Sequence, residues 1–147
     1  MSFFLRSLFL PLLLVVLTAV CSCSQQPLYP PPTLSGSDVS VDIASLRNEV
    51  PLFFTYRTNN KNVNFFVLLL NGKDLSFFDA CITCYPKKQG YRSEDTGVAC
   101  RACNMHFSVY KLEKGIGGCY PIKLEGRTDK GNYLIPVAAL EKMADKF

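Results

Sequence analysis

Five cysteines in the middle of the chain have the spacing of a metal site. Two Cys-x-x-Cys pairs lie fifteen residues apart, and one more cysteine follows after another fifteen: Cys81, Cys84, Cys100, Cys103 and Cys119. A Cys-x-x-Cys turn reverses the backbone and brings both sulfur atoms to one side. Two such turns that face each other supply four thiolates, which suits Zn²⁺ or an iron–sulfur cluster. We predict a metal or cluster centre, in which Cys119 is either a ligand, leaving one of the other four spare, or a nearby thiol.

The rest of the composition excludes several other chemistries. The chain has a single histidine, His106, so zinc proteases and three-histidine zinc sites are excluded. It lies three residues after Cys103 and is either an additional ligand or a strand residue beside a core phenylalanine. The glycine run at 115–118 lacks the Lys-Ser/Thr of a phosphate loop, so no nucleotide site is predicted. The net charge of +4 comes without a lysine or arginine cluster, so nucleic acid is not an expected partner.

The sequence around the cysteines resembles the FtrD-like membrane iron–sulfur domain family, which is associated with bacterial ferrous-iron uptake. The resemblance runs from about residue 64 to 140 and rests on a long motif: FDAC-x-x-CYP at 78–86, GYR at 90–92, V-x-C-x-x-C at 98–103 and G-x-GGC-x-PI at 115–122. It implies an iron–sulfur or metal centre that acts in iron handling or electron transfer. The five cysteines carry over as candidate ligands, and four residues as ones that shape the site: Asp79, Tyr91, Gly117 and Gly118.

The N-terminus has the features of an export signal of the lipoprotein type, which we assign to residues 1–22. Its apolar run, residues 7–20, is shorter than the roughly 20 residues that a membrane-spanning helix needs. Cys23 follows, with Val20 three residues before it and Ser22 directly before it, as in lipidated bacterial proteins. We predict lipidation at Cys23, and hence a protein held on the bacterial membrane at its extracytoplasmic side, in the periplasm or at the outer membrane. An uncleaved anchor and a plain secretory signal are the alternatives.

Export leaves two other uses for the cysteines open. Thiols outside the cytoplasm usually oxidise, so structural disulfides are one alternative, although five cysteines leave one without a partner. Thiol–disulfide exchange through a Cys-x-x-Cys pair is the other. No helix is predicted directly after Cys84, which argues against a thioredoxin-like site.

One small β-rich domain must position these residues. In 147 residues, 48% apolar and 19% charged, there is room for one core. We predict a Pro-rich tether at 23–37 and a domain at 38–147. The domain is expected to be an α+β antiparallel β-sandwich or partly open barrel with the two cysteine loops at one end, an architecture that a looser resemblance to Rieske-type domains also implies. Alternation and turn signals predict strands at 39–43, 52–57, 63–70, 75–78 and 133–135, and a helix at 136–147.

Taken together, these features predict a carrier rather than an enzyme. We expect an iron–sulfur cluster, with Zn²⁺ as the alternative cofactor, and redox or iron-transport proteins as partners. A structural zinc-binding interaction module is the second hypothesis, and a thiol–disulfide redox protein is the third. The lysines and arginines within the cysteine region, including Lys87 and Lys88, form either a basic rim for an acidic redox partner or a solvated loop face.

Overall fold

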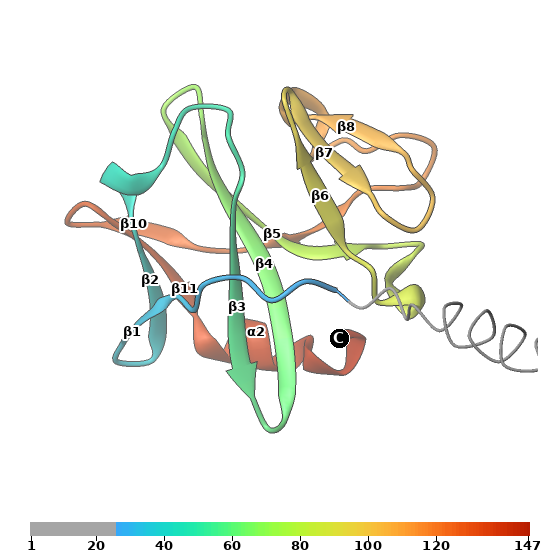
Figure 1. Cartoon of the computed structure of the whole chain (residues 1–147). Coiled ribbons are helices and arrows are strands. Elements are labelled where there is room, and N and C mark those ends of the chain that lie inside the picture. Colours follow the sequence, from blue (N-terminus) through green and yellow to red (C-terminus); the bar gives the residue numbers. More distant parts are fainter. Residues whose placement is uncertain (1–25) are drawn as a thin grey trace, which may run out of the picture.

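The computed structural model describes residues 26–147, which fold into three antiparallel sheets (Figure 1). The predicted export signal and Cys23 lie outside the described residues. The first sheet has the order β1 (Thr33–Ser35), β2 (Asp38–Asp42), β11 (Asn132–Pro136), β10 (Arg127–Asp129). The second has the order β3 (Leu52–Thr58), β4 (Lys61–Leu70), β5 (Lys73–Cys81), β9 (Pro121–Leu124). The third has the order β6 (Tyr91–Glu94), β7 (Gly97–Cys100), β8 (His106–Ser108).

Helical structure is short in this domain. The helix α2 (Val137–Lys142) follows β11, and four 3₁₀ turns occupy Ile43–Ser45, Tyr85–Lys87, Val109–Lys111 and Ala144–Lys146. Within residues 26–147, no helix has the length and apolar character needed to cross a membrane.

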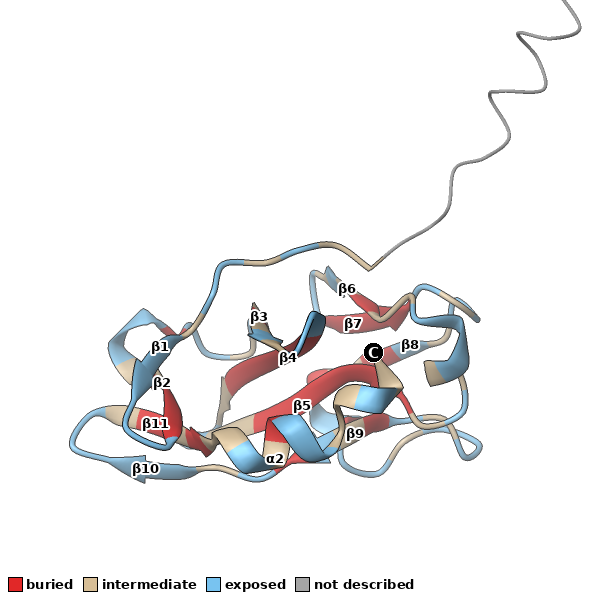
Figure 2. Cartoon of the chain, turned by 90° about the horizontal axis from the view of Figure 1, so that it is seen from below, coloured by how far each residue is buried: buried red, intermediate tan, exposed pale blue. Residues whose placement is uncertain are grey.

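The second sheet is the middle layer, and its two central strands, β4 and β5, pack in a core on each face (Figure 2). Successive side chains of a strand point to opposite faces. On β4, Phe65 and Val67 pack in a core shared with the first sheet and α2, whereas Phe66 and Leu68 pack in a second core shared with the third sheet. A strand covered on both faces reads as a continuous apolar run, which explains the sequence of β4.

The same alternation along β5 orients the site. Phe78 and Ala80 belong to the first core, and Phe77 and Cys81 belong to the second. Asp79 therefore shares the face of Cys81, and it contacts the third sheet by accepting a hydrogen bond from the backbone of Tyr91. The strand thus delivers a carboxylate and a thiol to the side where the second cysteine pair lies.

The predicted fold class is confirmed. The sheets are antiparallel and form a sandwich rather than a closed barrel, and the C-terminal helix is present. The five predicted strands correspond to β2, β3, β4, β5 and β11. The cysteine region, which showed little periodicity in sequence, contains the third sheet, whose strands are only three or four residues long.

The stretch expected as a tether lies against the domain from residue 26 onward. Its backbone is extended, as the prolines predict, and it crosses β4 and β3 of the middle sheet before it reaches β1 (Figure 1). Pro30 accepts a hydrogen bond from the Thr55 backbone at 3.2 Å, and the Tyr29 ring stacks on Phe53 with centroids 4.9 Å apart. Residues 33–35 then pair with β2. The segment is therefore held in place by the Tyr29 side chain and by backbone pairing with β2. Its composition alone predicts only a linker.

Candidate metal centre

Both cysteine pairs start at the end of a strand. Cys81 is the last residue of β5, and Cys100 is the last residue of β7. A turn follows in each case: the Cys84 N–H donates to the Cys81 carbonyl at 3.1 Å, and the Asn104 N–H donates to the Cys100 carbonyl at 2.8 Å. Each strand fixes its first cysteine, and each turn brings the second cysteine back beside it.

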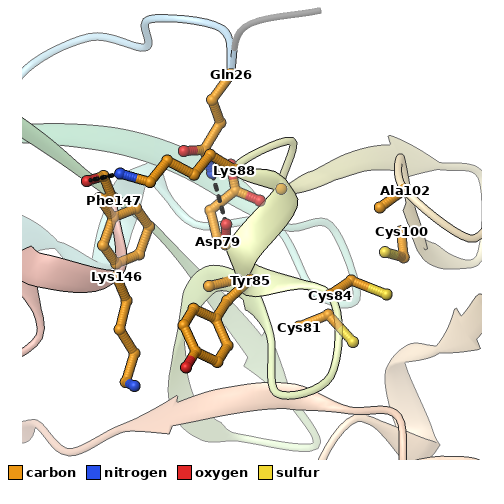
Figure 3. Close-up of a pocket in the computed structure, with 12 residues that line it drawn as sticks. Gln26, Asp79, Cys81, Cys84, Tyr85, Lys88, Cys100, Ala102, Lys146 and Phe147 are labelled. Atoms are coloured by element: carbon orange, nitrogen blue, oxygen red, sulfur yellow. Dashed lines mark hydrogen bonds between the residues drawn. The ribbon is translucent and has the colours of Figure 1, made fainter.

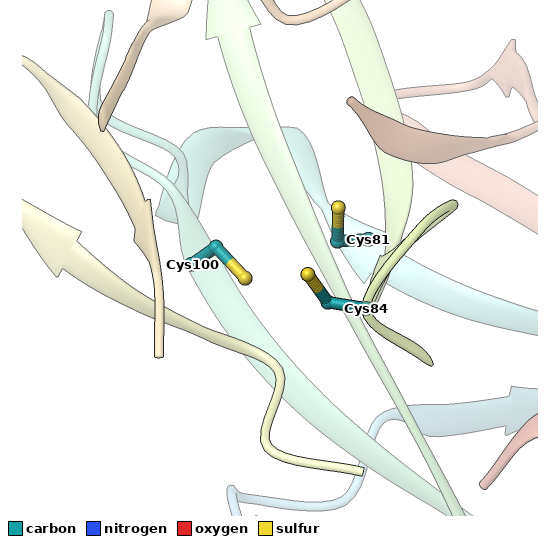
Figure 4. A group of neighbouring side chains, drawn as sticks. All are labelled: Cys81, Cys84 and Cys100. Atoms are coloured by element: carbon teal, nitrogen blue, oxygen red, sulfur yellow. The ribbon is translucent and has the colours of Figure 1, made fainter. Parts of the chain in front are cut away.

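Three sulfur atoms meet between these turns. The Sγ atoms of Cys81, Cys84 and Cys100 all lie within 4.8 Å of one another, and they point into one common space (Figure 4). Cys81 and Cys100 are buried and Cys84 is half-buried. Thiols from both turns are therefore gathered at one point, as the spacing predicts.

Cys103 lies at the exposed edge of this group. Burial raises the pKa values of the Cys84 and Cys100 thiols, and the nearby Cys103 thiol raises both further. Cys103 is exposed. Its position completes a set of four sulfurs, three of them tightly grouped and the fourth beside two of these.

Cys119 reaches the site from a separate loop. Its N–H and carbonyl pair with those of Ile116, at 2.9 and 2.8 Å, which closes a two-residue turn through Gly117 and Gly118. Both glycines have positive φ, +56° and +81°, as such a turn requires, and both are exposed. Cys119 packs against the second core, but its sulfur is outside the group of three that lie within 4.8 Å of one another. The loop is tied to the first cysteine turn, because the Thr83 hydroxyl donates to the Gly118 carbonyl at 3.2 Å.

Backbone N–H groups point at the sulfurs in the manner of a metal-binding turn. Burial alone would raise the pKa of the Cys81 thiol, but N–H groups of Cys84 and Thr83 donate to its sulfur, and the net direction is downward. The Cys100 sulfur receives the equivalent N–H groups of Ala102 and Cys103, although burial prevails there and raises the pKa. Such donors stabilise a thiolate, which is the form that binds metal.

Because the sulfurs lie close together, the cysteines are unfavourable as thiolates unless a cation is bound. The pKa of the Cys84 thiol is raised to about 12, mainly by burial and also by the nearby thiols of Cys103, Cys100 and Cys81. Several thiolates packed together repel one another, and a metal cation offsets that repulsion. The donor set of four sulfurs, with N–H groups directed at them, therefore fits Zn²⁺ or an iron–sulfur cluster.

Asp79, on β5, connects the two cysteine turns through hydrogen bonds. Its fully buried carboxylate accepts from the Tyr91 N–H and, at 2.9 Å, from the Gln26 side chain (Figure 3). Burial raises its pKa to about 7, while these donors and Arg101 act in the opposite direction. The Arg101 side chain in turn donates to the Tyr91 carbonyl at 2.9 Å. A chain of contacts thus runs from the strand of Cys81 through β6 to the turn that carries Cys100 and Cys103.

Gly90 permits this contact. Its φ is +64°, and a Cβ placed there would lie 2.4 to 2.6 Å from Gln26 Nε2 and the Asp79 carboxylate oxygens. Sequence reasoning missed the roles of Gln26 and Gly90. Gln26 lies in the stretch expected as a tether, and its partner is 53 positions away, so no local pattern indicates it.

His106 does not join the sulfurs. It lies on β8, its side chain is exposed, and its Nδ1 is hydrogen-bonded to Glu94. Its neighbour Phe107 is in the second core. The structure therefore matches the alternative of a strand residue flanking a core phenylalanine.

A narrow cleft leads from the cysteines toward the surface (Figure 3). Its volume is about 10 Å³, and Asp79, Cys81, Cys84 and Cys100 line its inner part. At its outer part, the Lys88 ammonium donates to the Phe147 carbonyl at 2.7 Å, and the Lys146 ammonium lies over the Tyr85 ring, 4.2 Å from its centroid. The cleft has no space for an organic substrate of ordinary size.

Comparisons with known proteins agree with the site. No curated protein and no solved structure matches the chain. A family model described as "Membrane iron-sulfur containing protein FtrD-like" matches residues 46–147, which contain all five cysteines of the site. The resemblance seen in the sequence is confirmed over a longer stretch than the motif itself covers. Since the match spans more than half of the chain, the protein belongs to the FtrD-like family of membrane iron–sulfur containing proteins.

Proposed function

We propose that the protein binds an iron–sulfur cluster through Cys81, Cys84, Cys100 and Cys103, and that it carries electrons in a bacterial iron-uptake system. The observation that supports this most directly is the convergence of sulfurs from two separate turns within 4.8 Å. Membership of an iron–sulfur family favours a cluster over a single zinc ion. Cys119 is then a neighbouring thiol rather than a ligand.

The surroundings of the sulfurs suit electron transfer rather than turnover of a substrate. A bound cluster would take up and release one electron at a time, at a potential set by ligand charge, hydrogen bonds and exposure. Here the chain supplies backbone donors to the Cys81 and Cys100 sulfurs, and it buries these two residues while leaving Cys103 exposed. The exposed corner is a natural point for electron exchange with another protein, because a carrier needs close approach and not a substrate pocket.

The proposed setting is the extracytoplasmic side of the bacterial cell envelope, in the periplasm or at the outer membrane. The support is the apolar run at 7–20 followed by Cys23, together with the membrane association of the family. Lipidation at Cys23 would hold the domain near its redox or iron-transport partners.

Anaerobic purification followed by absorption and EPR spectroscopy tests the proposal. The expected sample is brown, bleaches on reduction with dithionite and gives an EPR signal in one of its two oxidation states. A colourless protein without an EPR signal, purified and handled without oxygen, would contradict the proposal.

A structural zinc site is the second candidate, because turns with N–H groups directed at sulfur also suit Zn²⁺. In that case the purified protein contains zinc, and chelation unfolds it without any change of colour. A thiol–disulfide function predicts instead that insulin reduction persists after the metal is removed.

A further inference from the structure

The hydroxyl group of Tyr91 is a buried polar group without a partner. The side chain is fully buried, and within residues 26–147 its Oη has no hydrogen-bond partner. An unsatisfied buried hydroxyl costs about 1–3 kcal/mol, so proteins rarely keep one without a reason. A phenylalanine would fill the same space without that cost.

The tyrosine is fixed in place from several sides. Its N–H donates to Asp79, and its carbonyl accepts from Arg101. The ring packs edge-on against Phe66 and Phe107, with centroids 6.2 and 5.9 Å away. The hydroxyl therefore cannot turn away to find water or another acceptor.

Two thiols of the site lie near this hydroxyl. Tyr91 is paired with Cys100 across β6 and β7, and it shares the second core with Cys81 and Cys100. Burial raises the pKa of this hydroxyl, and the nearby Cys81 and Cys100 thiols raise it further. A neutral thiol is a weak acceptor, whereas a metal-bound thiolate carries charge and accepts well.

We propose that Tyr91 donates its hydroxyl proton as a hydrogen bond to the Cys81 sulfur when the centre is loaded, and that it thereby raises the reduction potential of the centre. The inference rests on the proposed function. A hydrogen bond to a ligand sulfur withdraws charge from the centre and favours the reduced, more negative state. The cost of the orphaned hydroxyl in the metal-free protein is offset once the thiolate forms.

Removal of the hydroxyl alone tests the inference. In the full chain, Tyr91→Phe should keep the iron and sulfide content of the wild type and lower the midpoint potential. We expect about a tenfold lower ratio of reduced to oxidised protein at a fixed potential, which equals about 59 mV for one electron. The matched control is Tyr133→Phe: Tyr133 is also buried, but its hydroxyl contacts Ser76, at 3.1 Å, in the first core. This control should leave the potential unchanged.

A second readout does not depend on the cluster type. The ultraviolet resonance Raman difference between wild type and Tyr91→Phe reports whether this hydroxyl donates a hydrogen bond. The Tyr91 hydroxyl should change from unbonded to hydrogen-bond donor when iron, or Zn²⁺ as a substitute, is added to the metal-free protein. An unbonded hydroxyl in the loaded protein, a potential unchanged in Tyr91→Phe, or an equal fall in Tyr133→Phe would each overturn the inference. Wild-type protein that never holds iron would instead overturn the proposed function, and the zinc-loaded Raman difference would still decide the role of Tyr91.

Discussion

Each cysteine pair contributes one buried and one more accessible sulfur. Cys81 and Cys100 are buried at strand ends, whereas Cys84 is half-buried and Cys103 is exposed. The buried pair is fixed by the sheets, and the other two depend on the turns. We therefore expect substitution of Cys81 or Cys100 to reduce metal binding more than substitution of Cys84 or Cys103. The strands fix the positions of the two buried sulfurs, so no other side chain can move in to replace them.

We expect Cys100→Ser to lose more than 90% of the bound iron and Cys119→Ser to keep most of it. Serine preserves size but is a poor ligand for iron–sulfur clusters, and only Cys100 belongs to the tight group of sulfurs. Iron per polypeptide after anaerobic purification, measured beside circular dichroism to verify folding, gives the comparison. Equal iron loss in both variants would mean that Cys119 is a ligand as well.

Asp79 gives the protein a pH dependence of its own. Burial raises its pKa from 3.8 to about 7 in the folded state. The folded protein then holds this proton more tightly than the unfolded chain. The contribution of the Asp79 proton to the free energy of unfolding is therefore complete below pH 4 and is lost as the pH rises to 7. Relative to Asp79→Asn, the free energy of unfolding of the wild type should fall by up to about 4 kcal/mol over this range.

Urea unfolding of the metal-free forms of both proteins between pH 4 and pH 8 measures this difference. Asp95→Asn, at an exposed loop position, is the control and should show no such trend. A constant difference between wild type and Asp79→Asn across this pH range would show that the buried carboxyl is not protonated in the folded protein.

At the scale of elements, the third sheet is the part whose position decides the site. It carries Cys100 on β7. It meets the middle sheet through the second core and, next to the cysteine turns, through the contact of Asp79 with the backbone at Gly90 and Tyr91. Any change that separates β5 from β6 should therefore separate the two cysteine turns.

Gly90→Ala should have this effect. A methyl group at this position would meet Gln26 and Asp79 at 2.4 to 2.6 Å, in addition to the strain of a φ of +64°. Gly36→Ala is the matched control, because its φ is +60° and nothing lies within 4 Å of the added carbon. We expect Gly36→Ala to cost about 1 kcal/mol and Gly90→Ala roughly 1–3 kcal/mol more, by urea unfolding. Similar losses in the two variants would show that the close approach at Gly90 is unimportant.

The elements differ in how far the sequence predicts them, and the reason is their length and burial. The strand at 63–70 is evident because a continuous apolar run of this length forms a strand buried on both faces. The strands β6 to β8 are too short to show alternation, and their pairing depends on the turns around the cysteines. The cysteine pairs themselves are predictable from spacing, but the contact of Gln26 with Asp79 is not, since it joins segments 53 positions apart.

At the scale of the whole molecule, positive charge near the site offers a way to select partners. Lys87 and Lys88 follow the first cysteine turn and are exposed. Among residues 26–147, neither forms an ion pair with an Asp or Glu side chain, and Lys88 donates to the Phe147 backbone oxygen. Exposed cations beside a redox centre attract anionic partners and raise the rate of association at low salt.

Small redox reagents of opposite charge test this field without the natural partner. Oxidation of the reduced protein by ferricyanide should slow several-fold at low ionic strength in Lys87→Glu/Lys88→Glu, and oxidation by a tripositive cobalt complex should speed up. Lys61→Glu/Lys130→Glu changes the net charge equally at exposed positions outside the cysteine region and is the control. If both double variants change the rates alike, only net charge matters and the proposed rim has no role.

The content of iron, acid-labile sulfide and zinc in the full-length protein, purified without oxygen, tests the central claim most directly. A cluster held by these cysteines predicts iron and sulfide in equal amounts, at two or more atoms of each per polypeptide, with zinc well below one. Protein that is folded but contains no iron or sulfide, with its cysteines metal-free, zinc-bound or joined in disulfides, would contradict it.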